Sequence, residues 1–561
     1  MKSHKFCSKI IAFFIFLVLL MIINHNMLIC SMTINLDKDA FNTNVNVTYL
    51  NMLNLTIMWK FKVNGTLLSV YSSVADINND GIPEVIIFSG YDAIYIINGE
   101  NGSLLLKYDL HVLPRYPAIA DINNDEILEI IIGYKYGGSS GGILVLLSNL
   151  NVLWEFKGDE WFHIPAVADV NKDGSLDIII GSENYVYVFN SNGEMIWRFP
   201  LESFIVSCPV LGNFDSDDFL EIVVCTRNGY VYLLDDDGKK LWEFKTGGIW
   251  LSSPAVGDID EDGRLEIVIG SLDNYLYVIN DDGTLLWKFC TNGDTRNPIL
   301  GDVDNDEELE IIVGTMNFTY TNLYVLNGKD GTLLWNFTTG GSIPFSPLLA
   351  DMNDDGFLDV IVYSMGGGGI KSFNRLHDEI LVLDGRNGSV LLNISFEDVV
   401  STPVLADLDG DKKLEMVLCT ENYVYALDGF IGIFSSWNQF RGDLKRSVEI
   451  SDWDLDGLSN EIEASINTSP RDMDSDNDHL LDGWEFVHGL NPCNPDSDGD
   501  GWNDGAEILY GTNPLDPSSF PKEIPPEKPQ YSYVHWLFIF MLLLLSMLII
   551  LHLLKEKRRR N

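Results

Sequence analysis

The sequence predicts an all-β fold: a β-propeller, with eight blades favoured and seven as the alternative, then a small stalk of Asp-rich loop repeats and a transmembrane helix. An acidic loop of the form Asp-x-Asn/Asp-x-Asp, with a carboxylate four residues later, occurs eight times at intervals of 44 to 56 residues. Three Asp-rich loops of another kind, whose starts lie 22 residues apart, follow residue 450. An apolar run of about 21 residues near the C-terminus is long enough to span a bilayer.

Each repeat unit contains four short strands. In residues 251–291, an apolar segment leads into the acidic loop and is followed by a β-branched run at 265–270. An alternating run at 275–279 ends at Asp-Asp-Gly, which is a hairpin turn signal, and a Trp-containing run at 285–289 closes the unit. Four antiparallel strands repeated at this period are typical of propeller blades.

The loops also carry evidence for an even number of blades. Gly follows the fifth loop position in the first, third, fifth and seventh loops, as Gly81, Gly174, Gly263 and Gly356. In the other loops this position holds Glu126, Asp218, Glu307 and Lys412. Duplication of a two-blade unit would explain this alternation, and chance drift is the alternative.

Two segments could close the ring by supplying the outer strand of the last blade. The segment around Trp59 precedes the first unit, and the segment around Trp437 follows the last one. Only one of them can occupy the position.

Side-chain oxygens at positions 1, 3, 5 and 9 of a tight loop are the ligands that calcium prefers. The eight loops begin at Asp76, Asp121, Asp169, Asn213, Asp258, Asp302, Asp351 and Asp407. The candidate metal ligands in them are Asp76, Asn78, Asp80, Glu84, Asp121, Asn123, Asp125, Glu129, Asp169, Asn171, Asp173, Asp177, Asp215, Asp217, Glu221, Asp258, Asp260, Asp262, Glu266, Asp302, Asp304, Asp306, Glu310, Asp351, Asn353, Asp355, Asp359, Asp407, Asp409, Asp411 and Glu415. We expect bound Ca²⁺ to stabilise the scaffold rather than to take part in catalysis. The alternative is that these residues only form Asx turns.

These units resemble the FG-GAP and related calcium-bearing repeats of integrin-type and polysaccharide-lyase propellers. The Asp/Asn-Gly-x-x-x-Trp turns, such as the one from Asp282 to Trp287, are similar to the Trp-docking turns of pyrroloquinoline quinone (PQQ) propellers. The resemblance covers roughly residues 58–440. It implies calcium in the loop that joins the first two strands of each blade, but it does not imply one activity.

The three loops after residue 450 place acidic residues at positions 1, 3, 5, 9 and 12, which is the spacing of EF-hand loops. The candidate metal ligands here are Asp452, Asp454, Asp456, Glu463, Asp474, Asp476, Asp478, Asp482, Glu485, Asp496, Asp498, Asp500, Asp504 and Glu507. The second loop departs from the pattern, since His479 stands where Gly is expected. The segment resembles thrombospondin type 3 repeats over roughly residues 450–518. Its small apolar content implies that ions hold it together as a stalk.

Composition and charge indicate an exported, membrane-anchored protein. The 82 acidic residues exceed the 36 basic ones, for a net charge of −46, which argues against a nucleic-acid partner. Basic residues precede an N-terminal apolar run, and others follow the C-terminal one, so the positive-inside rule places both ends in the cytoplasm and the bulk of the chain outside. The predicted parts are residues 1–31 (signal peptide or signal anchor), 32–57 (linker), 58–447 (propeller), 448–520 (thrombospondin type 3-like repeats), 521–533 (Pro-rich spacer), 534–554 (transmembrane helix) and 555–561 (basic cytoplasmic tail).

The outer region holds five cysteines and nine candidate glycosylation sites. The cysteines are predicted to be small buried hydrophobic residues, with a Cys208–Cys225 disulfide as the alternative. The Asn-x-Ser/Thr acceptors are Asn46, Asn54, Asn64, Asn101, Asn317, Asn336, Asn387, Asn393 and Asn467.

The face opposite the acidic loops is the candidate ligand face, because the loops of variable length fall there. Its candidate ligand-binding residues are Trp161, His163, Trp250, Arg296 and Arg375. The alternative is that the aromatics pack between blades. We predict a non-enzymatic cell-surface protein that binds an extracellular glycan or protein ligand. A polysaccharide lyase-like enzyme or a PQQ-like propeller enzyme is the alternative, although no clustered acid/base set and no adjacent Cys pair is seen in the sequence.

Overall fold

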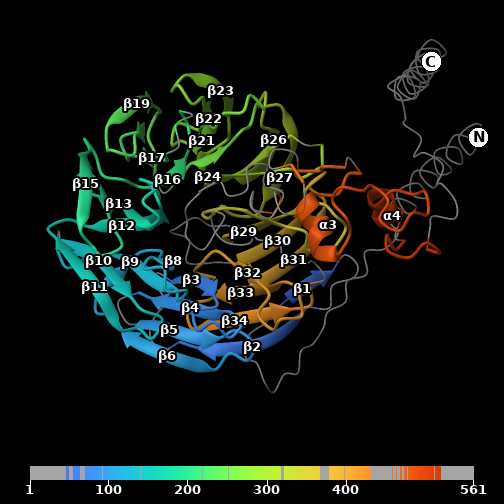
Figure 1. The fold of residues 1–561 in the computed structure, drawn as a ribbon, viewed down its shortest axis with the longest axis horizontal. Coiled ribbons are helices and arrows are strands. Elements are labelled where there is room, and N and C mark those ends of the chain that lie inside the picture. Colours follow the sequence, from blue (N-terminus) through green and yellow to red (C-terminus); the bar gives the residue numbers. More distant parts are fainter. Residues whose placement is uncertain are drawn as a thin grey trace, which may run out of the picture. The chain divides into compact units, whose positions relative to one another are not determined.

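Turn signals and β-branched runs alternate along the chain, and the described residues form eight antiparallel sheets arranged in a ring (Figure 1). The structure is a computed structural model. It describes residues 46–519 except for 50–54, 64–69, 91–92, 139, 216, 218, 251, 307, 317–320, 367–377, 397–398, 431–457, 459–462, 464–465, 467, 470–472, 477 and 511. The eight-blade prediction is confirmed, and the seven-blade alternative is wrong.

Each blade runs from an inner first strand to an outer fourth strand. Blade one comprises β3 (Val70–Ala75), β4 (Glu84–Ser89), β5 (Ala93–Asn98) and β6 (Leu104–Asp109). Blade two comprises β7 (Leu113–Pro114) with β8 (Ala118–Ala120), β9 (Glu129–Tyr136), β10 (Ser140–Leu146) and β11 (Val152–Gly158). Blade three comprises β12 (Phe162–Ala168), β13 (Asp177–Ser182), β14 (Tyr185–Phe189) and β15 (Met195–Pro200). Blade four comprises β16 (Val210–Gly212), β17 (Glu221–Cys225), β18 (Tyr230–Leu234) and β19 (Lys240–Lys245). Blade five comprises β20 (Ala255–Gly257), β21 (Glu266–Gly270), β22 (Tyr275–Ile279) and β23 (Leu285–Cys290). Blade six comprises β24 (Asp294–Gly301), β25 (Glu310–Met316), β26 (Thr321–Asn327) and β27 (Leu333–Thr339). Blade seven comprises β28 (Leu348–Ala350), β29 (Asp359–Ser364), β30 (Asp378–Asp384) and β31 (Val390–Phe396), with β1 (Asn46–Tyr49) along its outer edge. Blade eight comprises β32 (Val404–Ala406), β33 (Glu415–Cys419), β34 (Tyr423–Asp428) and β2 (Thr56–Lys62).

The core lies between blades. Second strands such as β4 and β13 are buried along their whole length, because neighbouring blades cover both of their faces. Eight clusters of buried side chains in the described residues each join two adjacent blades, such as the one that packs Ile86 of blade one against Ile130 of blade two. Outer strands such as β15 alternate between exposed and half-buried positions. Packing between blades is therefore the main source of stability for the ring.

Tryptophans of the outer strands fasten neighbouring blades together. Each of six such tryptophans donates its indole N–H, at 2.5–2.9 Å, to a carbonyl in the third-to-fourth-strand turn of the next blade: Trp59, Trp154, Trp197, Trp242, Trp287 and Trp335. At Gly283 the turn adopts φ +80°, and a Cβ there would lie 2.8 Å from the Trp242 ring. This position therefore requires Gly for two reasons, a left-handed backbone and direct contact with an indole.

The N-terminal strand closes the ring. β2 pairs antiparallel with β34, with Trp59 opposite Ala426, and so completes blade eight (Figure 1). The indole of Trp59 then reaches Gly99 of blade one. The first of the two closure predictions is confirmed, and residues 437–440 lie outside the described residues.

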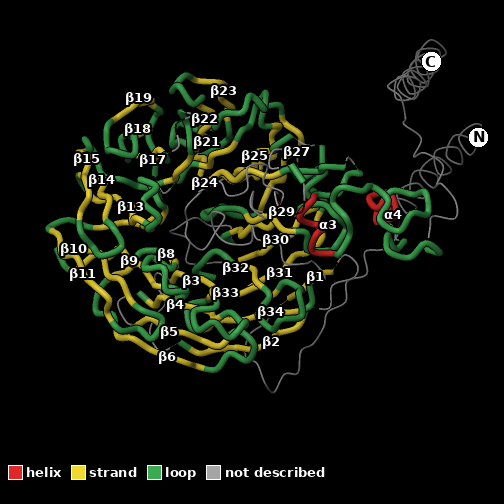
Figure 2. The backbone as a smooth tube through the Cα atoms, viewed as in Figure 1, coloured by secondary structure: helices red, strands yellow, loops and turns green. Residues whose placement is uncertain are grey.

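Two short helices follow the ring: α3 (Asp482–His488) and α4 (Asp504–Tyr510), drawn in red in Figure 2. The chain divides into two compact units, residues 1–495 and residues 496–561. Within the first unit, Met473, Leu481 and Trp484 pack on Leu309 of blade six. Neither described helix is long and apolar enough to cross a membrane. The predicted apolar segments at both ends lie outside the described residues.

The described cysteines form no disulfide with one another, so the alternative Cys208–Cys225 bridge is not formed. Cys208, Cys225 and Cys419 are buried, as the sequence predicts, whereas Cys290 and Cys493 are exposed.

Candidate metal centres and ligand face

Two hydrogen bonds give the acidic loops a common conformation. In the first loop, the Asp76 carboxylate accepts the N–H of Gly81 at 2.8 Å, and Asp80 accepts the N–H of Ile82 at 2.9 Å. The same bonds, from position 6 to position 1 and from position 7 to position 5, recur in other blades. Gly81 has φ +86°, and Glu126 adopts φ +68° at the same place in the second loop. Lys412 of the eighth loop also has φ +68°, so the two Gly-less loops described at this position keep the conformation in spite of its backbone strain.

The position-9 carboxylate is buried beneath each loop, at the start of the second strand. In seven blades one of its oxygens accepts the N–H of loop position 2; in blade six, for example, Glu310 Oε2 accepts the Val303 N–H at 3.0 Å. The other oxygen of Glu310 is buried and has no hydrogen-bond partner among the described residues, and the same holds for Glu221 Oε1 in blade four. A buried carboxylate oxygen without a donor favours either a proton or a cation.

The pKa of these carboxyl groups shows the cost of burying them without a cation. Burial, opposed by the backbone N–H and reinforced by the loop aspartates, raises the pKa of Glu310 to about 9. The same causes raise the pKa of Glu266 and Glu415 to about 8, and of Glu84 to about 7. A cation in the loop would offset this cost by keeping the carboxylate ionised.

Distances within the loops fit calcium. In blade six, ligand oxygens of Asp302, Asp304, Asp306 and Glu310 all lie within 4.8 Å of one another. Oxygens bound to one calcium ion at about 2.4 Å cannot be farther apart than about 4.8 Å, which is twice that distance. The sets Asp258, Asp260 and Asp262, and Asp407, Asp409 and Glu415, meet the same limit. The donor set and its spacing thus fit a hard cation with oxygen ligands.

Blade four uses a residue that sequence reasoning missed. Asn213 donates its side-chain amide to the Asp217 carbonyl, while Asp235 joins Asp215 and Glu221 within the same 4.8 Å limit. Asp235 follows the third strand of the blade. Asp384 occupies the corresponding position in blade seven, at the end of the third strand. The signal in the sequence that could have identified this additional ligand is an Asp at the end of the third strand or directly after it.

Side chains at loop position 4 link neighbouring loops. Asn124 donates to the Gly174 carbonyl of the next blade at 2.9 Å, and Asn305 donates to the Gly356 carbonyl at 2.9 Å. Asn305 also donates to the backbone carbonyl of His479, at 2.8 Å, in the second stalk loop. His479 has φ +78° at the position where the sequence pattern expects Gly. The loops therefore contact one another and, at blade six, the first part of the stalk segment.

The stalk loops repeat the geometry of the propeller loops. Position 1 accepts the N–H of position 6 in both described loops, as Asp474 does from His479 and Asp496 from Gly501. Position 9 again accepts the N–H of position 2, at 2.8 Å for Asp482 and 2.9 Å for Asp504. The buried position-12 residues of the second and third loops are Glu485 and Glu507, and Glu463 of the first loop is also buried. The first loop's Asp452, Asp454 and Asp456 lie outside the described residues.

The opposite face carries two aromatic–cation pairs. Lys135 Nζ lies 3.1 Å from the centroid of Trp161, whose indole N–H binds the Gly138 carbonyl at 2.8 Å. The Arg227 guanidinium lies 4.3 Å from the centroid of Trp250. Both indoles are partly exposed. The first contact joins an inter-blade segment to a second-to-third-strand loop, so these segments share one face.

Other predicted residues of this face are less accessible. Arg296 is only 7% exposed and faces Asp294 at 4.0 Å. His163 has a buried Nε2, and burial followed by the charge of Arg115 lowers its pKa to about 3. Arg375 lies outside the described residues. Among the predicted ligand-binding residues that the structure describes, Trp161 and Trp250 are therefore the ones with side chains accessible to a ligand.

Comparison with known families gives two matches. Residues 182–342 and 227–443 match the family described as "Outer membrane protein assembly factor BamB". Residues 496–517 match the family described as "Bacterial TSP3 repeat". The resemblance of the propeller to PQQ-type repeats, and of the third stalk loop to thrombospondin type 3 repeats, is thus confirmed. No curated protein matches the chain.

Several solved structures are similar to this chain at low identity. The biofilm matrix protein Bap1 of V. cholerae is 14% identical, covers 69% of this chain and 94% of its own, and gives a TM-score of 0.50. BamB from Moraxella catarrhalis is 13% identical, with 67% and 97% covered and a TM-score of 0.45. The quinohemoprotein alcohol dehydrogenase ADHIIG from Pseudomonas putida HK5 is 12% identical, with 67% and 76% covered and a TM-score of 0.48. The likeness to Bap1 indicates the propeller fold alone.

Proposed function

We propose that this chain is a cell-surface binding protein: an extracellular β-propeller, anchored in the membrane by its C-terminal segment, that binds a glycan or protein ligand. The observation that carries the proposal is the pair of partly exposed tryptophans, Trp161 and Trp250, each with a cation over its ring. An indole face binds the apolar face of a sugar ring, and a neighbouring Lys or Arg favours an anionic group on it. We therefore expect an acidic glycan to be the preferred ligand.

Calcium in this proposal stabilises the scaffold. The acidic loops join first and second strands, on the face away from Trp161, so an ion there would not contact the ligand. Its effect would be to neutralise carboxylates that are otherwise crowded within 4.8 Å, where each charge pair costs about 3–4 kcal/mol at the effective dielectric of a protein surface. The ligand face would thus be held by a rigid ring.

An enzymatic alternative finds less support in the geometry. His163 and Arg296, the titratable residues predicted for this face, belong to β12 of blade three and β24 of blade six. General acid–base catalysis requires such groups within hydrogen-bond reach of one reacting centre. We therefore favour binding without turnover.

Binding of labelled acidic and neutral polysaccharides to cells that express the full chain tests this proposal. Trp161→Ala and Trp250→Ala are each expected to lower binding at least ~10-fold, which corresponds to about 1.4 kcal/mol for a lost stacking contact. Leu241→Ala, which truncates an exposed side chain on the outer strand of blade four, is the control and should bind normally. Deletion of residues 534–561 should release the binding activity into the medium. Normal binding by both Trp variants would overturn the assignment of the ligand face, and retention of the shortened chain on cells would overturn the anchor.

A further inference from the structure

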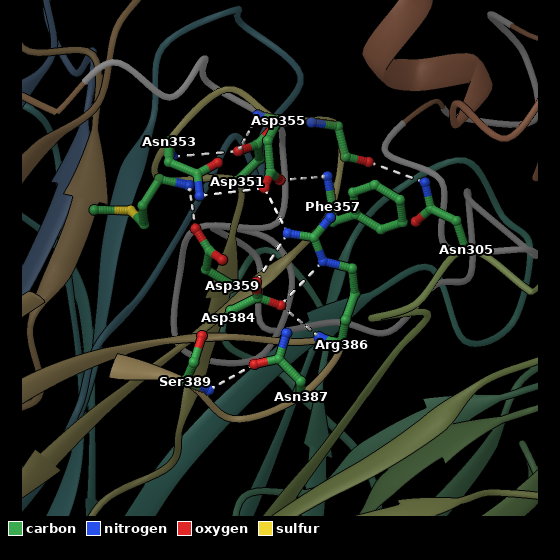
Figure 3. Close-up of polar contacts among 12 residues, drawn as sticks. Asn305, Asp351, Asn353, Asp355, Phe357, Asp359, Asp384, Arg386, Asn387 and Ser389 are labelled. Atoms are coloured by element: carbon green, nitrogen blue, oxygen red, sulfur yellow. Dashed lines mark hydrogen bonds and ion pairs between the residues drawn. The ribbon is translucent and has the colours of Figure 1, made fainter. Parts of the chain in front are cut away.

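In blade seven a guanidinium group donates to a ligand of the acidic loop, which the described residues show for no other blade. Arg386 Nη2 donates to Asp355 Oδ2 at 2.7 Å and to Asp384 Oδ2 at 2.8 Å (Figure 3). Its Nε donates to Asp384 Oδ1 at 3.0 Å, which makes the contact with Asp384 a two-pronged one. Asp355 is the position-5 ligand of the predicted calcium site. A built-in cation thus occupies one of the carboxylates that a calcium ion would need.

Both oxygens of Asp355 have partners. Oδ1 accepts the N–H of Phe357 at 3.2 Å, and Oδ2 accepts from Arg386. The Phe357 ring covers the guanidinium at 4.2 Å, and Figure 3 shows Arg386 held between Asp355 and Asp384. A calcium ion could use Asp355 fully only by breaking a charge-assisted pair that is partly shielded from water.

Blade six offers a direct comparison, because its turn has the same form. Lys329 stands where Arg386 stands in blade seven, at the second residue after the third strand. Lys329 Nζ pairs with Glu261 at 3.1 Å and with Glu308 at 3.5 Å, both of which lie outside the four-carboxylate group of loop six. Within that group, Glu310 Oε1 is buried and has no hydrogen-bond partner among the described residues. Loop six therefore presents an open set of ligands.

We infer that Arg386 serves as the resident cation of the seventh loop, so that this blade is ordered without calcium while loop six depends on the ion. The inference rests on the proposed calcium sites and specifies how they differ. It assigns Arg386 a role in setting calcium affinity: the guanidinium lowers the calcium affinity of one loop without removing any ligand residue. One blade of the ring would then stay folded when calcium is scarce.

Hydrogen exchange measured by mass spectrometry on the purified full chain, in EDTA and in calcium, tests this inference. Peptides that cover residues 302–310 should exchange at least ~10-fold more slowly when calcium is added, whereas those covering 351–359 should change by less than ~2-fold. In the Arg386→Gln variant, the seventh loop should gain a calcium response of at least ~10-fold. Lys329→Gln, the matched change in blade six, should leave the response of both loops as it is.

The outcomes separate this inference from the proposed calcium sites. A wild-type seventh loop that responds to calcium as strongly as loop six would overturn the role of Arg386. So would an Arg386→Gln seventh loop that remains insensitive to calcium while loop six still responds. If neither loop of the wild-type chain responds, and calorimetry detects no bound calcium, the calcium sites themselves are wrong.

Discussion

Replacing Glu310 with Gln should stabilise the protein without calcium and destabilise it with calcium. Glu310 is fully buried, and its pKa is raised to about 9 from an ordinary value of 4.5. At pH 7 without an ion, the folded protein holds this carboxyl protonated although the unfolded chain ionises it. This costs about 1.4 kcal/mol for each of the roughly 2.5 pH units between 4.5 and 7, or about 3.5 kcal/mol in total. The glutamine of the Glu310→Gln variant keeps an oxygen for the Val303 N–H and carries no such cost.

In calcium the change in stability caused by Glu310→Gln should reverse in sign. The ion then neutralises Glu310 in the wild type, whereas Gln would supply no charge to the ion. The reversal requires the loss of calcium affinity to exceed about 300-fold, which would just offset the ~3.5 kcal/mol gained in EDTA. We expect Glu310→Gln to lower the affinity by about 1,000-fold, which removes ~4.1 kcal/mol of stabilisation at saturating calcium. Urea unfolding followed by tryptophan fluorescence, in EDTA and in calcium, measures both effects. Glu308→Gln is the control, since this half-buried side chain of the same loop contacts Lys329 and should change either curve by less than ~0.5 kcal/mol.

The opposite signs are the decisive result. If Glu310→Gln lowers stability in EDTA as much as it does in calcium, Glu310 acts as an ordinary hydrogen-bonding residue, and its buried carboxyl group is not a cation ligand.

Acidification and a glycine substitution provide two further tests. The folded pKa of the position-9 carboxyls, at about 7 to 9, lies above the unfolded value, so the folded state binds more protons between pH 4.5 and 9. In EDTA the melting temperature should therefore rise as the pH falls from 8 to 5. In saturating calcium, which keeps these carboxyls ionised, this rise should disappear. A melting temperature in EDTA that falls on acidification would contradict the assignment. Gly283→Ala should destabilise the ring by about 2 kcal/mol or more, because it combines a left-handed backbone with a clash against Trp242. The control is Gly410→Ala, at φ +79° with open space around it, which should cost about 1 kcal/mol. Equal losses of stability in chemical denaturation would show that the indole contact adds nothing.

The second stalk loop rests on the acidic loops of the propeller. Asn305 bonds both to the Gly356 carbonyl of blade seven and to the His479 carbonyl, and His488 Nε2 lies 3.0 Å from Asp354 Oδ1. The contact is therefore made by the residues at position 4 of the sixth and seventh loops. The sequence showed His479 only as a departure from the Gly pattern, whereas the structure gives its carbonyl a partner.

Patterns that repeat along the chain were sufficient to predict the blades. Strand length, the alternation of apolar residues, the Gly-containing turns and the ligand positions are local, and each blade reproduces them because each packs in the same way against its neighbours. The Asp/Asn-Gly-x-x-x-Trp turns were identified in the same manner, since they recur at the blade period. The third stalk loop was likewise identified from its spacing and is matched by the bacterial TSP3 family.

Contacts between different segments were decided by the tertiary structure alone. Closure by β2 brings residues 56–62 against residues 423–428, and the sequence offered a second segment of equal quality. The recruitment of Asp235 in blade four and the placement of Arg386 on Asp355 depend on how a turn folds back over the loop of its own blade. The sequence by itself therefore determined the repeat and its candidate ligands, because these are local and periodic; packing between distant segments decided which loops are open to a cation and which side chains face a ligand.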